Sequence, residues 1–327
     1  MQLYCTLFDR NYTTRGLAMQ RSLLAHNPDS RLIVLCLDQV TFDALSALAP
    51  AQAELVTLES LERFDPALAR VRPQRKPVEY YWNCKPVLMK YGFAKYPSAP
   101  WITFLDSDLF FFGDLAPLRS ETDAGNVAIT PHRFPPRLQH LLQHGTFNAG
   151  WVGARNGGDG IRFIEWWRER CLEWCHAVVE RDRFGDQKYL DRVPGLFSGV
   201  CAIGHRGANL APWNVDGMRI SSEKGRVHVE GVPLLFFHFH ALRCMFYRLY
   251  DSGLSNYGVA ITPDVRNLVY RPYLAALRQS EQALSGLPAP MRRQFASRAP
   301  AIRLRDWVDH LRQARRLIRR EAQLLWQ

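Results

Sequence analysis

The chain has 327 residues, 47% of them hydrophobic, and a formal net charge of +11. A chain of this length and apolar content can bury a large core, which excludes disorder for most of it and favours one large α/β domain with an appendage, or two domains. Its seven scattered cysteines are odd in number, which argues against a disulfide framework and favours reduced thiols in a cytoplasm.

The N-terminus predicts a strand and no export signal. The stretch QLYCTLF, residues 2–8, alternates along its length and lacks the basic and apolar regions of a secretory signal. No run of 18 apolar residues occurs later, so no membrane-spanning helix is expected. We therefore expect a cytoplasmic protein, with peripheral binding to the inner face of the cell membrane as an open option.

Positive charge is concentrated at the C-terminus. From Met291 onward, ten arginines stand against three acidic residues, a net charge of +7. Apolar residues between Leu304 and Leu325 lie close to a helical period, which predicts a basic amphipathic helix. Such a helix can lie on an anionic membrane surface, or pack on its own domain or a second copy. No nucleic-acid-reading module accompanies it, so no specific nucleic-acid partner is expected.

Strands and helices alternate through the first third of the chain. Their expected order is strand 3–8, helix 14–26, strand 31–37, a helix beginning near 41, and strand 53–58. This alternation predicts parallel pairing in a doubly wound sheet. A helix is expected next over 77–94, and WITFLD, residues 101–106, is typical of a fully buried central strand.

The remaining elements complete an α/β domain and a separate tail. Strand-like stretches lie at 126–130, 147–154, 226–231 and 233–240, with a long helix at about 158–180 and a proline-rich linker at 288–300. We therefore divide the chain into a mostly parallel α/β domain, residues 1–262, and a helical, arginine-rich extension, residues 263–327.

Two carboxylates stand one residue apart directly after the central strand. FLDSDLFFF, residues 104–112, places Asp106 and Asp108 where a parallel strand ends, and ligands of open α/β sheets bind outside that end. Carboxylates this close repel each other unless a cation lies between them. Their oxygens suit Mg²⁺ or Mn²⁺ bridging a diphosphate, whereas the alternative is a solvated strand cap and turn.

A histidine pair can complete this site. In LLFFHFH, residues 234–240, His238 and His240 are two apart at the end of an apolar strand, so they face the same side. An imidazole nitrogen among the ligands favours Mn²⁺ over Mg²⁺. The alternative is one hydrogen-bonded core histidine and one exposed histidine.

These motifs, in this order, resemble those of the GT-A fold nucleotide-sugar glycosyltransferases with a DxD motif. The chain looks most similar to the group that includes bacterial lipopolysaccharide galactosyltransferases and glycogenin, over about residues 1–245. The resemblance implies a GT-A fold for the catalytic domain. It also implies that Asp106 and Asp108 bind the metal and that His238 is the third ligand. His240 is the second candidate for that third position.

Two further motifs resemble donor-binding segments of that family. LFDRNYTTRGLAMQRSLLAHNP, residues 7–28, is similar to the nucleotide-binding opening, which implies that Asp9 and Asn11 hold uracil and ribose. The alternative is that both residues cap a strand-to-helix turn. FNAGWV resembles the family's Asn-Ala-Gly strand, which implies that Asn148 and Gly150 line the donor-sugar pocket.

FGDQKYL resembles the segment near the anomeric carbon. This implies that Asp186 binds sugar hydroxyls and that Gln187 lies at the reacting face. Lys85, in NCKPVL, is either a further donor contact or a solvated helix lysine.

The sequence departs from the family after the histidines. Ala241 stands where glycine is usual, and Arg243 is the nearest cation where Lys-Pro-Trp is expected. APWN, residues 211–214, occurs earlier and is out of register as a substitute. The departure leaves the diphosphate contacts open.

The resemblance implies a metal-dependent hexosyltransferase. Its donor would be a nucleoside diphosphate sugar, above all a UDP-sugar, and its acceptor a hydroxyl of a glycan or glycolipid, with retention of anomeric configuration. Several tryptophans could stack on sugars, namely Trp151, Trp166, Trp167, Trp174 and Trp213. Those within 158–180 are more typical of a helix core. The alternatives are a Mg²⁺-dependent phosphatase of the HAD type and a homologue that binds nucleotide sugars without catalysis.

Overall fold

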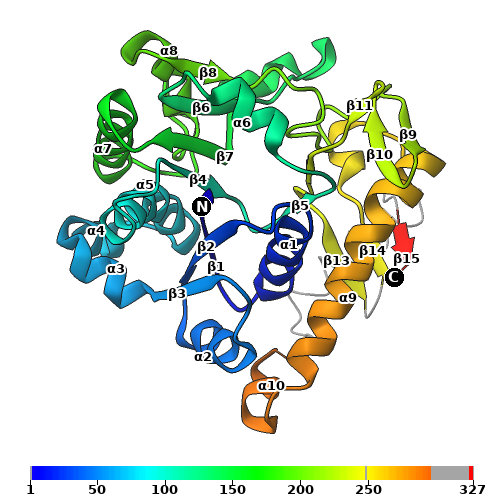
Figure 1. Ribbon diagram of the computed structural model, residues 1–327, viewed down its shortest axis with the longest axis horizontal. Coiled ribbons are helices and arrows are strands. Elements are labelled where there is room, and N and C mark those ends of the chain that lie inside the picture. Colours follow the sequence, from blue (N-terminus) through cyan, green and yellow to red (C-terminus); the bar gives the residue numbers. More distant parts are fainter. Residues whose placement is uncertain (1, 247–248, 296–323, 327) are drawn as a thin grey trace.

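The computed structural model describes residues 2–246, 249–295 and 324–326. Its centre is a seven-stranded sheet with helices on both faces (Figure 1). The strand order is β3 (Ala53–Thr57), β2 (Ser30–Cys36), β1 (Gln2–Phe8), β4 (Trp101–Leu105), β7 (Phe147–Arg155), β6 (Val127–Pro131) and β8 (Val200–Ala202). Strands β1 to β4 are parallel, as predicted, and β7 runs antiparallel to both β4 and β6.

Both faces of the sheet are buried, which explains the nearly continuous apolar strands. Alternate residues of β1 enter opposite cores: Leu3 and Cys5 belong to one cluster, and Tyr4 and Phe8 to the other. The first core lies under α5 (Pro77–Lys95) and α7 (Gly158–Glu173). The second lies under α1 (Thr13–His26) and α2 (Gln39–Leu48).

In the part of the chain that the structure describes, further helices and three small sheets surround the central sheet and these four helices. The helices are α3 (Leu58–Phe64), α4 (Pro66–Val71), α6 (Ala116–Thr122), α8 (Val193–Leu196), α9 (Arg271–Ser285) and α10 (Ala289–Phe295). The smaller sheets pair β5 (Leu109–Phe111) with β12 (Phe236–His238), β9 (Ile220–Glu223) with β10 (Arg226–Val229) and β11 (Val232–Pro233), and β13 (Arg243–Phe246) with β14 (Leu249–Asp251) and β15 (Leu324–Trp326).

Three expected elements differ from the structure. The long helix ends at Glu173 rather than near 180, because the backbone N–H of Ala177 bonds to the side chain of Glu79 on α5. The stretch 233–240 is broken between β11 and β12, where the Leu235 N–H bonds to Gly207 O instead. Within the expected linker, residues 289–295 form α10, whose proline lies in the first turn, where it is tolerated.

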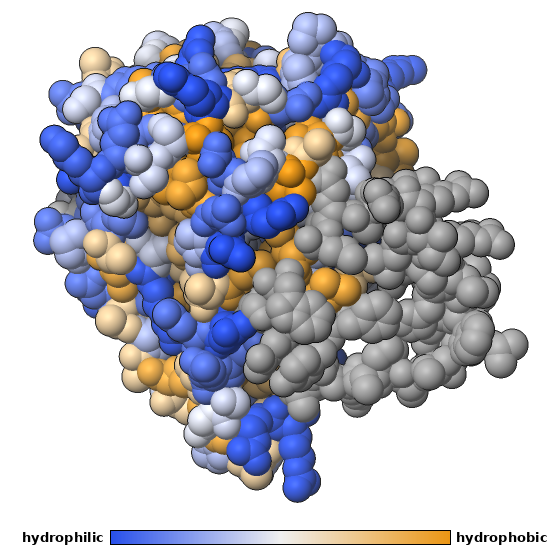
Figure 2. Space-filling model, turned by 90° about the vertical axis from the view of Figure 1, so that its right-hand side faces the viewer, coloured by the Kyte–Doolittle hydropathy of each residue, from blue (hydrophilic) through white to orange (hydrophobic). Residues whose placement is uncertain are grey.

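Helix α9 packs on α1. Tyr273, Leu274 and Leu277 are buried and share a hydrophobic cluster with Ala18 of α1. The division at 262/263 remains a prediction. Most of the predicted basic helix falls within residues 296–323, outside the described part of the chain, but its expected end at Leu325 is wrong, because this residue pairs with Tyr250 in the strand β15. Figure 2 shows the face over α9, where hydrophilic side chains predominate and hydrophobic ones show between them. Among the described residues, every helix is too short or too polar to cross a bilayer.

Candidate active site

A cleft of about 680 Å³ opens where β1, β2 and β4 end at their carboxyl termini. Its lining includes Asp9 after β1, Asp106 and Asp108 after β4, and His238 and His240 at the end of β12. The sequence placed these residues at strand ends, and the fold brings those ends to one cavity, as expected for an open α/β sheet.

Antiparallel pairing of β5 with β12 brings the acids to the histidines. Leu109 lies opposite His238, and the Phe239 N–H donates to Asp108 O at 2.9 Å. As a result, His238 Nε2 is 3.1 Å from Asp108 Oδ1 and 3.9 Å from Asp106 Oδ2. The acid pair and the histidine motif therefore form one cluster, although they are far apart in the sequence.

The tautomer of His238 is fixed by a chain of hydrogen bonds behind it. His132 Nδ1 lies 3.2 Å from Thr146 O, an acceptor only, so His132 Nε2 accepts from Asn148 Nδ2 at 3.3 Å. The oxygen of Asn148 then faces His238 Nδ1 at 3.2 Å and must accept its proton. The lone pair of a neutral His238 Nε2 therefore points at the two carboxylates.

The geometry of this cluster fits a divalent cation. Ligand atoms of Asp108, His238 and His240 all lie within 4.8 Å of one another. Atoms about 2–2.5 Å from one ion are at most about 5 Å apart, so these three can share one. Burial opposes a charge on His238, but Asp108 outweighs burial and raises the pKa of His238, so the site favours positive charge. Oxygen and imidazole ligands together suit Mn²⁺.

Glycine at position 150 leaves room beside this cluster. A Cβ there would lie 2.7 Å from His238 Cε1 and 2.9 Å from Asp106 Oδ2. Both distances are below any normal contact, so every other residue would displace a proposed metal ligand. The same glycine accepts the Asp106 N–H on its carbonyl at 2.8 Å.

Lys85 is buried rather than solvated. Its Nζ lies 3.1 Å from Asp106 Oδ1 and 3.1 Å from Asp186 Oδ2, and it donates to Ala149 O at 3.3 Å. Burial opposes its charge, but the two carboxylates outweigh burial and raise the pKa of Lys85. A charged lysine therefore joins the DxD motif to the predicted catalytic segment.

Gln187 lines the cleft in a fixed orientation. Its Oε1 accepts hydrogen bonds from Asn148 Nδ2 and from the Ala149 N–H, both at 3.2 Å, while its Nε2 donates to His144 O at 3.0 Å. Asp186, its neighbour, is buried with its carboxylate toward Lys85. Both residues therefore lie on the same wall as Asn148.

Asp9 and Asn11 follow β1 and bond to each other, but Asn11 is exposed and lies outside the cleft lining. Asp9 accepts the backbone N–H and the side-chain amide of Asn11, each at 2.9 Å. Asp9 lines the cleft together with Tyr12 and Tyr81. Sequence reasoning missed both tyrosines, because neither Tyr12, the residue before α1, nor Tyr81, on α5, stands out by type or spacing.

Arg243, the predicted diphosphate contact, lies elsewhere. It is exposed on β13, outside the cleft lining. Arg15 of α1 instead reaches the segment after the histidines, where its Nη2 donates to Leu242 O at 2.7 Å. Burial opposes the charge of Asp108, but His238 and, less strongly, Arg15 lower the pKa of Asp108. No sequence signal marked Arg15, because its position follows from the packing of α1 against residues 239–242.

Trp213 contributes the wall next to the histidines. Its ring centroid lies 5.3 Å from that of His238 and 5.7 Å from that of His240. The APWN segment reaches this place because Leu210 forms a parallel bridge with Phe237 of β12. Of the tryptophans considered for sugar stacking, Trp213 lines the cleft, whereas Trp167 is fully buried in the core.

Two proteins of Bacillus subtilis strain 168 are similar to this chain along most of its length. YfnD is 30% identical over 288 residues, which span 84% of this chain and 88% of YfnD. YfnF is 33% identical over 250 residues, which span 73% of this chain and 81% of YfnF. No protein-family model matches the chain.

A solved structure shares the fold. The crystal structure of galactosyltransferase LgtC in complex with donor and acceptor sugar analogues superposes with a TM-score of 0.51. It covers 89% of this chain and 99% of LgtC, at 16% sequence identity. This likeness confirms the predicted fold class, a glycosyltransferase-type α/β fold with a mostly parallel sheet.

Proposed function

We propose that this chain, which belongs to the same family as YfnD and YfnF of Bacillus subtilis, is a metal-dependent glycosyltransferase that uses a nucleoside diphosphate sugar. The observation that carries the proposal is the cluster of Asp108, His238 and His240 in a cleft large enough for such a donor. Asp106 lies beside the cluster, with its Oδ2 3.9 Å from His238 Nε2. The shared fold with a galactosyltransferase supports it.

The proposed cofactor is Mn²⁺, or Mg²⁺, held by the two carboxylates and the two histidines. Bound there, a divalent cation would act as a Lewis acid on the negative charge that develops on the departing diphosphate. Asn148 keeps His238 Nδ1 protonated, and thus leaves Nε2 free to serve as a ligand.

The proposed donor is a UDP-sugar. Asp9 offers carboxylate oxygens to a uracil N–H at the end of the cleft where Tyr12 and Tyr81 add flat apolar surface. Gly150 lets a sugar ring approach the backbone next to the acids. Lys85 holds Asp106 and Asp186 in place by pairing with both carboxylates.

Gln187 is the proposed residue at the reacting face. Loss of the diphosphate leaves an oxocarbenium-like anomeric carbon, a type of transition state also met in glycoside hydrolysis. The amide oxygen of Gln187 carries partial negative charge and can stabilise it. Attack by the acceptor hydroxyl on the same face as the leaving group would retain the configuration, as the resemblance implies.

The proposed acceptor is a hydroxyl of a glycan or glycolipid at the inner face of the cell membrane. Phe134, Trp213 and Tyr257 line the cleft beyond the histidines, and such rings suit sugar faces that carry C–H groups. The phosphatase alternative gains no support, because the DxD motif follows β4 rather than the first strand and meets a histidine pair.

The test combines thermal shift and donor hydrolysis across a panel of nucleotide sugars, with and without Mn²⁺. We expect one UDP-sugar to raise the melting temperature only with metal and to be hydrolysed slowly. Both effects should vanish in Asp108→Asn and persist in the exposed control Asp29→Asn. Metal-dependent binding without hydrolysis or transfer would favour the non-catalytic homologue, and no metal-dependent binding of any donor would contradict the proposal.

A further inference from the structure

Three exposed valines gather at one side of the cleft mouth. Val78, Val178 and Val179 have exposed fractions of 45%, 57% and 38%. Val78 also lines the cleft. Single exposed apolar residues are normal on protein surfaces, but a group of them at the mouth of a cleft is typical of a binding surface.

The loop that follows α7 brings these valines together. Glu79 of α5 accepts a hydrogen bond from the Ala177 N–H at 3.0 Å, and its other oxygen lies 3.3 Å from His176 Nδ1. Farther along the same loop, the Phe184 ring packs against Trp82 of α5 with centroids 6.1 Å apart. Val178 and Val179 therefore lie beside the first turn of α5, which contains Val78. We call these three residues the valine rim.

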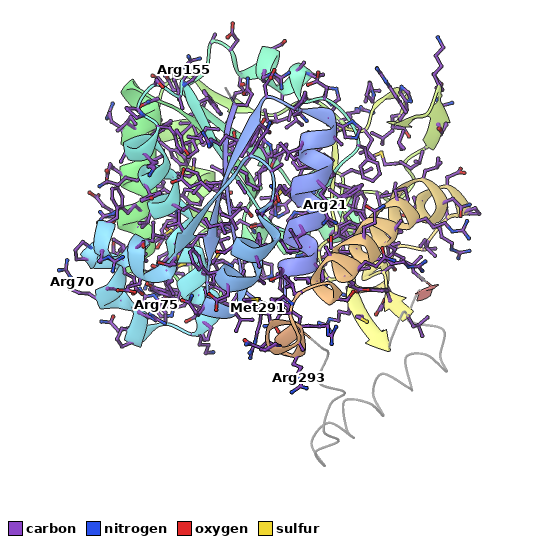
Figure 3. The ribbon with its side chains drawn as sticks, turned by 60° about the horizontal axis from the view of Figure 1, so that its bottom comes forward. Arg21, Arg70, Arg75, Arg155, Met291 and Arg293 are labelled. Carbon is purple, nitrogen blue, oxygen red and sulfur yellow. The ribbon has the colours of Figure 1, made fainter. Side chains whose placement is uncertain are left out.

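Basic side chains border the valine rim. The nearby acids are already engaged, since Glu62 pairs with Arg72 at 3.0 Å and Glu180 pairs with Arg183 at 2.9 Å. Lys76, two residues before Val78, and Arg181, two residues after Val179, are exposed and have no ion pair within the described residues, and against them stands the exposed Asp182. Arg75, the neighbour of Lys76, donates to Leu172 O near the end of α7 at 3.1 Å, and Figure 3 shows Arg75 on the same side of the molecule as Arg70 of α4.

We propose that the valine rim and its bordering cations bind the surface of an anionic lipid bilayer. Aliphatic side chains next to lysine and arginine match a membrane interface, where the valines enter the headgroup region and the cations meet anionic lipids. Because Val78 belongs to both the rim and the cleft lining, this contact turns the cleft mouth toward the membrane.

Contact of the valine rim with a membrane would bring lipid-linked acceptors close to the cleft. This step rests on the proposed function: a sugar acceptor carried by a membrane lipid would lie at the mouth of the cleft. The membrane contact itself involves neither the metal ligands nor the donor, so it can be measured separately. It is also distinct from any contribution of residues 296–323.

The experiment is co-sedimentation of the full-length chain with vesicles of phosphatidylcholine, alone or mixed with phosphatidylglycerol. We expect binding to the mixed vesicles that falls with added salt. Removing two cations in Lys76→Gln with Arg181→Gln should weaken binding about 30-fold, since each cation near an anionic surface contributes about fivefold. Val178→Asp with Val179→Asp should weaken it at least about tenfold.

Two control pairs match these changes at other surfaces. Leu196→Asp with Met218→Asp alters residues with exposed fractions of 45% and 37%. Arg219→Gln with Arg226→Gln removes two exposed cations at β9 and β10, on the side of the molecule opposite α4 (Figure 1). Both pairs should bind like the unaltered chain.

An unaltered chain that ignores the mixed vesicles, rim variants that bind normally, or controls that lose as much binding would each overturn the proposal. Donor-dependent thermal shifts are recorded for the same variants in solution. If these shifts persist while vesicle binding is absent, only the membrane contact fails; if vesicle binding holds while every donor is ignored, only the proposed function fails.

Discussion

His238 Nδ1 lies 3.2 Å from Asn148 Oδ1, so a strand of the central sheet orients the imidazole that faces the acid pair. Asn148 sits on β7, and its amide group donates in the other direction, to His132 and Gln187. A single carboxamide thus links the proposed metal site to the proposed reacting face.

Asn148→Ala should therefore weaken Mn²⁺ binding by about 10–100-fold, because His238 loses the acceptor that fixes its tautomer. Calorimetric titration of the protein with Mn²⁺ measures this directly. Asn126→Ala, which removes a different amide-to-backbone bond at Ser198 O, should leave the affinity unchanged. Equal affinities in both variants would show that the bond to Asn148 does not orient a metal ligand.

Lys85→Met should destabilise the protein by about 3–5 kcal/mol, since it leaves the buried carboxylate of Asp186 and the partly buried carboxylate of Asp106 without their cation. The comparison is Lys90→Met on the same helix, which removes a half-exposed partner of Glu165 and should cost about 0–1 kcal/mol. Urea unfolding at pH 7 without metal gives both values. A cost for Lys85→Met no larger than that for Lys90→Met would contradict the buried pairing.

His132 makes the stability depend on pH. Burial lowers the pKa of His132 to about 3, whereas an unfolded histidine has a pKa of about 6.5. Between these values the unfolded chain binds more protons, so stability falls as pH falls below about 6.5. From pH 7 to pH 5 the loss from this residue is about 2 kcal/mol.

Urea unfolding of the unaltered protein, His132→Asn and His140→Asn at both pH values isolates that contribution. The drop between pH 7 and pH 5 should shrink in His132→Asn and stay the same when the exposed His140 is replaced. An unchanged drop in His132→Asn would mean that His132 does not stay neutral in the folded state.

Ala241→Gly should raise the unfolding free energy by up to about 1 kcal/mol. Ala241 has a φ of 63°, in the left-handed region, where a Cβ costs about 1–2 kcal/mol and glycine does not carry this cost. Ala202→Gly, on the exposed strand β8, should instead lower stability by about 0.5–1 kcal/mol. Thermal or urea unfolding decides, and a loss of stability in Ala241→Gly would contradict the strain at this position.

The sequence predicted the elements that converge on the site, because their positions follow from periodicity and from the rule that strand ends meet. Asp106 after a buried strand and His238 at the end of an apolar stretch needed no other information. The departure at Ala241 also has a counterpart in the backbone, since this residue adopts the conformation that glycine accepts most easily.

Other features depend on which distant segments pack together, which a single sequence does not encode locally. Lys85 looked like any helix lysine, and its burial follows from carboxylates on two other segments. Arg243 is nearest to the histidines along the chain but lies on an outward strand, whereas Arg15 reaches Leu242 from α1. Trp213 reaches the cleft through a bridge between the irregular segment at Leu210 and Phe237 of β12.

The pairing of β5 with β12 also sets an order of events during translation. Residues 109–111 emerge from the ribosome long before 236–238, so a nascent chain holds β5 without the strand that hydrogen-bonds to it. Until then, the edge of an apolar Leu-Phe-Phe segment is open to pairing with other chains. The edge of β5 is covered only once residues 236–238 have been synthesised and have paired with it.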